Sequence, residues 1–330
     1  MVAIIGTGII PFGHHLERSI VAMASEATLA ALKDANISRE TIGACYFANA
    51  LGGMLFGDTT IGQNLTAGLG IKNIPVVNVE NACTSGSSAY YLARLAILAG
   101  ECEVALVVGS EKMCVPDFGL LNSGTTELDT LLGMVVPASF ALRAQRHMHD
   151  YGTTEEQMAA VTVKSRAHAA LNPNAQFRKK ESLEDVLNGP MIADPFTRSQ
   201  CCPIADGAAA LILASDEFAA KYYRAITIEA SVLTSGIYDN QADLTHWETD
   251  YHAADLAYEK AGISAKDIDL VECHDAFTFS EILHYEALGL CEEGQGGKFV
   301  ADGHASLGGR TPVNVSGGLL SEGTPSPPPE

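Results

Sequence analysis

One cysteine of the sequence stands at a position suited to nucleophilic chemistry. A predicted buried strand runs to Val79, and Cys83 follows it just before a predicted helix that begins at Ser85. A thiol at a helix N-terminus feels the positive end of the helix dipole and unpaired N–H groups, which favour the thiolate. The small residues 84–88 leave room for an acyl group and for backbone amides that hold an oxyanion. We therefore predict that Cys83 is a nucleophile; the alternative is a small cysteine that only fills space at the junction.

A histidine and an aspartate follow another predicted strand, in the tract VECHDAFTFSEILHYEALGL. His274 and Asp275 precede an amphipathic helix, so in a doubly wound fold they lie at the carboxyl edge of the sheet. A neutral imidazole there can orient water, donate to an oxyanion or accept a thiol proton. We predict a catalytic role for His274, whereas the structural alternative is a histidine that caps the helix or hydrogen-bonds to Asp275.

A glycine-rich tract near the end of the chain, PVNVSGGLLSEGTP, is the third candidate. Ser316 and Gly317 follow a predicted strand into a turn that can pass close to a ligand. This tract predicts a substrate contact, although alone it is a weak signal. The sequence contains no zinc-binding cysteine pattern and no dinucleotide, phosphate-loop or serine-hydrolase signature.

The elements that would position these residues alternate between apolar strands and helix-length segments, as in α/β layers. The first series consists of predicted strands at 2–10, 43–50, 75–79 and 103–109 and predicted helices at 17–35 and 85–99. The second consists of strands at 226–233, 268–274 and 312–316 and helices at 251–261 and 278–288. The two series match in order and in several residues, which indicates a duplicated unit.

The region between the two series has a charge unlike that of the rest of the chain. From Arg143 to Arg198 it carries eight basic and seven acidic residues, although the whole chain has a formal charge of −20. A phosphate-bearing ligand is therefore expected here, with Arg143, Arg178, Lys179 and Arg198 as candidate contacts. The alternative is a solvated surface with ordinary charge mixing.

Composition limits the classes of protein that need be considered. The chain has 330 residues, of which 47% are apolar and 18% charged, so it is expected to fold with a sizeable core. Its negative charge argues against nucleic acid or an anionic membrane as a partner. Eight cysteines without a disulfide pattern, and the absence of a signal peptide or a long apolar run, favour a soluble cytoplasmic protein.

Taken together, these tracts resemble the thiolase superfamily, and within it the sterol-carrier-protein-type and archaeal-type thiolases. The resemblance covers most of the chain, from IIGTGIIPFG through VENACTSGSSA and DPFTRSQCCPIADGAAALILAS to ECHDAF and PVNVSGGLLSEGTP. It implies that Cys83 is acylated by an acyl-CoA, that Glu80 belongs to the motif rather than to the chemistry, and that His274 helps to hold an oxyanion.

The resemblance also implies a fold and a set of partners. The expected fold has two βαβαβαββ halves in five α-β-α-β-α layers, as a homodimer, with a loop domain that binds coenzyme A. Coenzyme A and acyl-CoA are expected as substrates, with no tightly bound cofactor. The corresponding regions are 1–115 for the half with the nucleophile, 116–222 for the loop domain and 223–330 for the second half, which we expect to be incomplete and to leave an apolar sheet edge exposed.

Two features depart from the family pattern. Gly323 and Pro325 enclose Thr324, where the family's G-H-P tract has a histidine that activates the nucleophile, and the family's later cysteine has no counterpart. A threonine hydroxyl is no base near pH 7. The expected function is a thiolase-type acyl-CoA C-acyltransferase. The alternatives are an impaired acyl-CoA-binding subunit that needs a partner, such as a small OB-fold protein, and a thiolase-like retro-aldolase.

Overall fold

The computed structural model describes residues 1–116, 128–236 and 243–322. The chain divides into two compact units: unit 1 consists of Met1–Pro116 and Ala205–Leu233, and unit 2 of Asp117–Ile204 and Thr234–Glu330. Among the described residues, no helix is long and apolar enough to cross a membrane, and no group of three or more His, Cys, Asp or Glu side chains could hold a metal ion. The division into regions 1–115, 116–222 and 223–330 stays a prediction.

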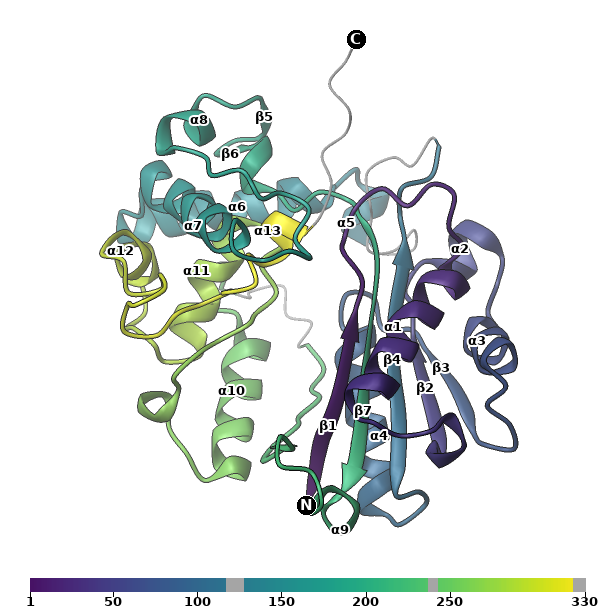
Figure 1. Cartoon of the computed structure of the whole chain (residues 1–330). Helices are drawn as coiled ribbons and strands as arrows, with labels where there is room; N and C mark the ends of the chain where they lie inside the picture. Colours follow the sequence, from purple (N-terminus) through teal and green to yellow (C-terminus); the bar gives the residue numbers. More distant parts are fainter. Residues whose placement is uncertain (117–127, 237–242, 323–330) are drawn as a thin grey trace. The chain divides into compact units, whose positions relative to one another are not determined.

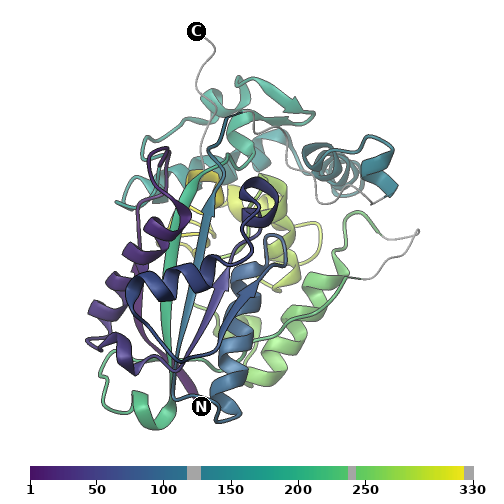
Figure 2. The same ribbon diagram turned by 90° about the vertical axis from the view of Figure 1, so that its right-hand side faces the viewer.

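Unit 1 is built on a six-stranded sheet with the order β3-β2-β4-β7-β1-β8 (Figures 1 and 2). Its strands are β1 (Val2–Ile9), β2 (Ala44–Ala48), β3 (Val76–Val79), β4 (Val104–Lys112), β7 (Asp206–Ser215) and β8 (Ile226–Thr227). β2 pairs in parallel with β3 and β4, whereas β7 pairs antiparallel with β4 and β1. The carboxyl ends of β2, β3 and β4 therefore share one edge.

Helices cover both faces of this sheet because the central strands are apolar on both sides. Leu106 and Ile212 belong to the core that holds α1 (Ile20–Asp34) and α3 (Ile61–Leu69). Their neighbours Val107 and Leu213 face the opposite way, into the core that holds α4 (Ser85–Leu98). The two-residue alternation along a strand thus sorts adjacent side chains into separate cores.

The glycines of β1 allow α1 to approach the sheet closely. A Cβ atom on Gly8 would lie 2.1 Å from the carbonyl oxygen of Ala27 in α1. Ser19 caps this helix by accepting a hydrogen bond from the Ala22 amide, at 3.1 Å. Two shorter helices complete unit 1, α2 (Gly52–Phe56) and α9 (Asp216–Ala219).

Unit 2 is mainly helical in its described part. Its helices are α5 (Leu128–Leu131), α6 (Val136–Tyr151), α7 (Glu155–Ala169), α8 (Leu183–Leu187), α10 (Glu248–Ala261), α11 (Thr278–Ala287), α12 (Gly296–Ala301) and α13 (Leu319–Glu322). The strands β5 (Met191–Ala193) and β6 (Phe196–Thr197) form a two-stranded sheet. Phe279, Ile282 and Tyr285 of α11 are fully buried at the centre of the unit 2 core.

The second sheet expected from the duplication is not formed by the described residues. The segments 268–274 and 312–316 make one parallel bridge, between Val271 and Val313, and contain no strand. The segment 226–233, predicted as a strand of the second series, is β-structure only at Ile226–Thr227, where β8 pairs with β1 of unit 1. The prediction that this segment is a strand of the second series was therefore wrong. Leu270, next to the bridged Val271, is 50% exposed.

Candidate functional site

The turn that carries Cys83 is stabilised by local hydrogen bonds. The Ala82 amide donates to Glu80 Oε1 at 2.8 Å, and the Ser85 hydroxyl donates to the Ala82 carbonyl at 2.7 Å. Ala82 has a φ of 46°, a conformation that residues with a Cβ atom seldom adopt. The turn places Cys83, an exposed residue, just before α4, and it gives Glu80 a structural contact.

The electrostatics of Cys83 oppose formation of the thiolate. Protein atoms that crowd the sulfur raise the pKa of Cys83, its own backbone amide lowers that pKa, and the Glu111 carboxylate raises it again. The position of Cys83 at a helix N-terminus predicts that the thiolate is favoured. The net direction is the reverse, because loss of hydration and a nearby negative charge outweigh the amide. Acylation of this thiol therefore requires a proton acceptor.

Glu111 lies at the carboxyl edge of β4 and ties it to the end of β2. Its carboxylate accepts hydrogen bonds from Asn49 Nδ2 and the Ala50 amide, both at 2.9 Å. Burial raises the pKa of Glu111, although these donors act in the opposite direction. The residue is thus a structural link at the sheet edge as well as a source of negative charge for Cys83.

The tract that carries His274 belongs to unit 2. His274 has an exposed surface, and its carbonyl oxygen lies 2.9 Å from His284 Nε2. Asp275 is fully buried, and its Oδ1 accepts a hydrogen bond from the Leu319 amide at 2.6 Å. Burial, followed by the charge of Glu281, raises the pKa of Asp275 well above its usual range. Asp275 therefore serves the turn before α13 rather than the His274 ring.

The second and third predicted tracts lie side by side in unit 2. Ser316 donates from its amide to Glu272 Oε1 at 2.9 Å and from its hydroxyl to Glu272 Oε2 at 2.7 Å. Gly317 is buried with a φ of 109°, and a Cβ atom there would lie 2.6 Å from the Ala169 Cβ. The glycine is required by its conformation and by close packing on α7, and its predicted substrate contact stays a prediction.

Three polar residues on and just after α7 hold the backbone of this turn, and they are not among the residues predicted from the sequence. Lys164 Nζ lies 2.8 Å from the Val313 carbonyl oxygen, His168 Nδ1 lies 2.9 Å from the Asn314 carbonyl oxygen, and Asn172 Nδ2 lies 2.9 Å from the Ser316 carbonyl oxygen. Their regular four-residue spacing places them on one side of a helix. That spacing is the signal that could have revealed them.

A buried polar network surrounds Asn314. Its Nδ2 donates to Glu281 Oε2 at 2.7 Å, and its Oδ1 accepts from the Cys273 amide at 2.8 Å. Lys164 and the Tyr285 hydroxyl both contact Glu281 Oε1. The network ties α7 and α11 to both predicted tracts of unit 2.

The residues predicted to contact coenzyme A differ in their exposure and in the protein contacts that they already make. The Arg143 guanidinium donates to the Leu244 carbonyl at 3.1 Å and lies 5.4 Å from the centre of the Trp247 ring. Arg178, Lys179 and Arg198 are exposed. Part of the predicted basic charge is used internally, since Lys164 and Arg166 pair with Glu281 and Glu181.

Comparison with known proteins decides the family. The model of the thiolase N-terminal domain matches residues 2–183, and the model of the thiolase C-terminal domain-like family matches residues 230–327. The chain belongs to the thiolase family. Among thiolase relatives, it is 38% identical to the benzoylsuccinyl-CoA thiolase subunit BbsB of Thauera aromatica, over 98% of this chain and 84% of that protein.

One further relative and one solved structure are similar to this thiolase-family chain. It is 36% identical to the acetyl-CoA acetyltransferase of Methanothermobacter thermautotrophicus, over 98% of this chain and 86% of that protein. It superposes with a TM-score of 0.83 and 27% identity on a chain of the Ltp2-ChsH2(DUF35) aldolase structure, over 98% of this chain and 85% of that one. The thiolase fold and the resemblance to acyl-CoA acyltransferases are thereby confirmed. Thr324 lies outside the described residues.

Proposed function

We propose that this thiolase-family chain is an acyl-CoA C-acyltransferase in which Cys83 carries the acyl group. The Cys83 thiol passes its proton to a base and its sulfur attacks the thioester carbonyl of an acyl-CoA; the bond from that carbonyl to the coenzyme A sulfur breaks, and the coenzyme A thiolate takes up the proton from that base. In condensation, the acyl group then passes to the carbanion of a second acyl-CoA. In thiolysis, the Cys83 sulfur instead attacks the 3-oxo carbon of a 3-oxoacyl-CoA, the bond between C2 and C3 breaks, C2 of the departing acyl-CoA takes up a proton, and the acyl group passes from Cys83 to the thiol of coenzyme A. The place of the exposed residue Cys83 on the turn before α4 is the observation that carries this proposal.

His274 is proposed to donate a hydrogen bond to the oxyanion that develops on the thioester oxygen, or to accept the Cys83 proton. Its neutral form at pH 7 supports both roles, because crowding by protein atoms and the charge of His284 lower the pKa of His274. Thr324 leaves the role of the family's activating histidine without a base.

For the anionic coenzyme we propose the exposed cations Arg178, Lys179 and Arg198 as contacts, with Ser316 and Gly317 near the acyl group. The reversal Lys179→Glu should weaken coenzyme A binding in calorimetry, whereas Lys260→Glu, at the end of α10, is the control. Equal affinities would remove Lys179 from the site. Arg143 stays the weakest of these candidates because its guanidinium already has protein partners.

The test of the acyltransferase proposal is covalent capture. After incubation with acetyl-CoA, intact mass should show one acyl adduct on the chain, which Cys83→Ala removes and Cys102→Ala retains. Cys102 is a suitable control because it is a partly exposed thiol of the same unit. Absence of an adduct on the unchanged chain would contradict the proposal.

Two other functions each have a specific observation in their favour. BbsB is named as a subunit, which favours a chain that binds acyl-CoA and turns over only with a partner; thiolysis by the purified chain alone would exclude this. The likeness to the Ltp2-ChsH2 aldolase favours retro-aldol cleavage of a CoA-linked side chain. Cleavage that persists in Cys83→Ala would support the aldolase. A homodimer and a cytoplasmic location stay predictions.

A further inference from the structure

The segment 268–274 of unit 2 matches β2 of unit 1 in its hydrogen bonds as well as in its place along the chain. The Cys45 amide donates to the Pro75 carbonyl at 2.9 Å, and the Val271 amide donates to the Pro312 carbonyl at 3.0 Å. Each of these donors also forms a parallel bridge with the residue that follows its proline partner. The segment therefore takes the position of β2, and the tract that begins at Pro312 takes the position of β3.

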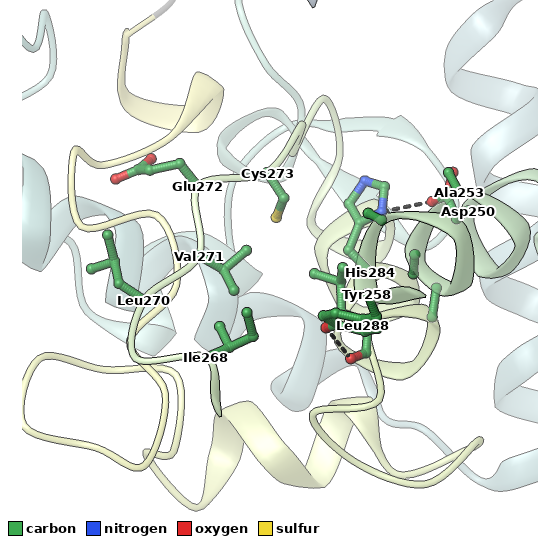
Figure 3. Close-up of a pocket in the computed structure, with 13 residues that line it drawn as sticks. Asp250, Ala253, Tyr258, Ile268, Leu270, Val271, Glu272, Cys273, His284 and Leu288 are labelled. Atoms are coloured by element: carbon green, nitrogen blue, oxygen red, sulfur yellow. Dashed lines mark hydrogen bonds and ion pairs between the residues drawn. The ribbon is translucent and has the colours of Figure 1, made fainter. Parts of the chain in front are cut away.

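The other edge of this segment carries backbone amides that β2 uses for pairing and that are unused here. The amides of Val271 and Cys273 donate toward the glycine-rich tract. Successive amides of an extended segment point to opposite edges, so those of Leu270 and Glu272 point the other way. Figure 3 shows the same alternation in the four side chains. Within the described part of the chain, the Leu270 and Glu272 amides have no acceptor, whereas β2 pairs along its whole corresponding edge with β4.

A groove of about 440 Å³ lies between the segment and α10 (Figure 3). Ala253 and Ala257 of α10 line it. At the offset that relates the segment to β2, these residues match Ala27 and Ala31 of α1, which are fully buried in the core against the unit 1 sheet. Ala253 and Ala257 are instead partly exposed. Thus α10 presents the small side chains that let a helix lie close to a strand, and none of the described strands lines the groove.

We propose that this groove accepts an extended segment of a separate polypeptide, which pairs in parallel with residues 268–274 as β4 pairs with β2. The occupant needs apolar side chains at alternate positions toward α10, because β4 places Leu106 and Val108 in the core that holds α1. The lining of the groove contains the carboxyl groups of Asp250 and Glu272 and neither lysine nor arginine, so the occupant is not acidic.

The last residues of this chain do not fit the description of the occupant. Residues 323–330 include four prolines, and proline lacks the N–H that a strand donates to its neighbour. A bound strand would hold the backbone that leads to His274 by hydrogen bonds on both edges, as β2 is held. The inference is independent of the proposed acyl transfer, so Cys83→Ala should bind the strand as the unchanged chain does.

The first test is amide hydrogen exchange of the full chain with a peptide copied from β4, VALVVGS, carrying a lysine tail for solubility. At saturation the peptide should slow exchange of the Leu270 and Glu272 amides by about tenfold or more. The Val271 and Cys273 amides, bonded in both states, are the internal control. A peptide with Val108→Pro lacks a backbone donor for the pairing and should protect neither amide. Absence of protection by the VALVVGS peptide would overturn the proposal.

The second test fills the groove from α10. Ala257→Leu should weaken binding of the VALVVGS peptide by about fivefold or more, since the added side chain takes the space of the strand. Glu259→Leu, at an exposed position of α10 outside the groove, is the matched control and should leave the affinity unchanged. Equal affinities of the two variants would place the peptide elsewhere and overturn the proposal.

The free chain provides the test of other occupants. If the Leu270 and Glu272 amides are already protected without peptide, the edge is occupied and the proposal is wrong. Sedimentation velocity then identifies the occupant, because a dimer indicates a second copy of the chain and a monomer indicates a segment of the same chain. Failure of Cys83 acylation contradicts the proposed function and leaves strand binding unaffected.

Discussion

Equivalent segments of the two units are held in place by different means. In unit 1, β2 is paired along its length with β3 on one side and β4 on the other. In unit 2, the matching segment 268–273 has one bridge, to Val313, and the adjacent turn is held by side chains of α7 and its extension. The Cys83 turn is thus positioned by a backbone ladder, and the His274 tract by a set of buried polar side chains. The second arrangement depends on individual residues.

The largest predicted effect comes from removing the cation of the buried network. Lys164→Met leaves Glu281 buried without its counter-ion and should lower the free energy of unfolding by about 3–5 kcal/mol. Denaturant titration measures this loss. Lys260→Met, on α10, is the control and should lie within about 0.5 kcal/mol of the unchanged chain. A loss below 1 kcal/mol for Lys164→Met would mean that the side-chain network does not position this tract.

Gly317→Ala tests the close approach of the glycine turn to α7. The substitution should cost about 1–3 kcal/mol for the conformation alone, and more because of the contact with Ala169. Gly308→Ala measures the cost of the backbone conformation without the cost of the contact, since Gly308 has a φ of 83° and no neighbouring atom within 4 Å of the added Cβ. Equal losses in the two variants would show that packing on α7 contributes nothing.

The pH dependence of stability tests another contact between α7 and the glycine turn, the one made by His168. His168 Nδ1 faces the Asn314 carbonyl and His168 Nε2 accepts from the Leu307 amide at 3.1 Å, so the neutral ring fits and the protonated ring does not. Burial lowers the pKa of His168 in the folded chain. The unfolded chain then binds more protons, so this contribution is present above the unfolded value of about 6.5 and is lost as the pH falls below it.

The variant His168→Asn keeps a donor near the Nδ1 position but does not titrate in this range. Its free energy of unfolding should therefore fall less between pH 7.5 and pH 5.5 than that of the unchanged chain. Urea titrations at pH 5.5 and 7.5 compare it with the unchanged chain. A steeper pH dependence in the variant would refute the assignment of a neutral His168.

The smallest predicted effect belongs to unit 1. Glu111→Gln removes a negative charge that raises the pKa of Cys83, so alkylation of Cys83 by iodoacetamide at pH 7.5 should become faster, by about twofold to tenfold. Glu103→Gln, just before the opposite end of β4, is the control. Slower or equal alkylation in Glu111→Gln would exclude its carboxylate from the electrostatics of Cys83.

Short-range patterns in the sequence predicted some of these features well. The strand before Cys83 ends at Val79 and α4 begins at Ser85, as the apolar run and the small residues indicated. The strand β7, by contrast, is a central strand of the unit 1 sheet although it lies far along the chain, within the predicted middle region. An apolar run identifies a strand but does not identify its partners, because pairing depends on contacts between distant segments.

The sequence by itself determined the family, the candidate nucleophile and the order of strands and helices around it, because these follow from local spacing and residue type. Only the tertiary structure decided the electrostatic direction at Cys83 and the α7 contacts to the glycine turn. Each of these depends on distance and burial between residues far apart in the chain, and the charge of a side chain depends on those surroundings as much as on its type.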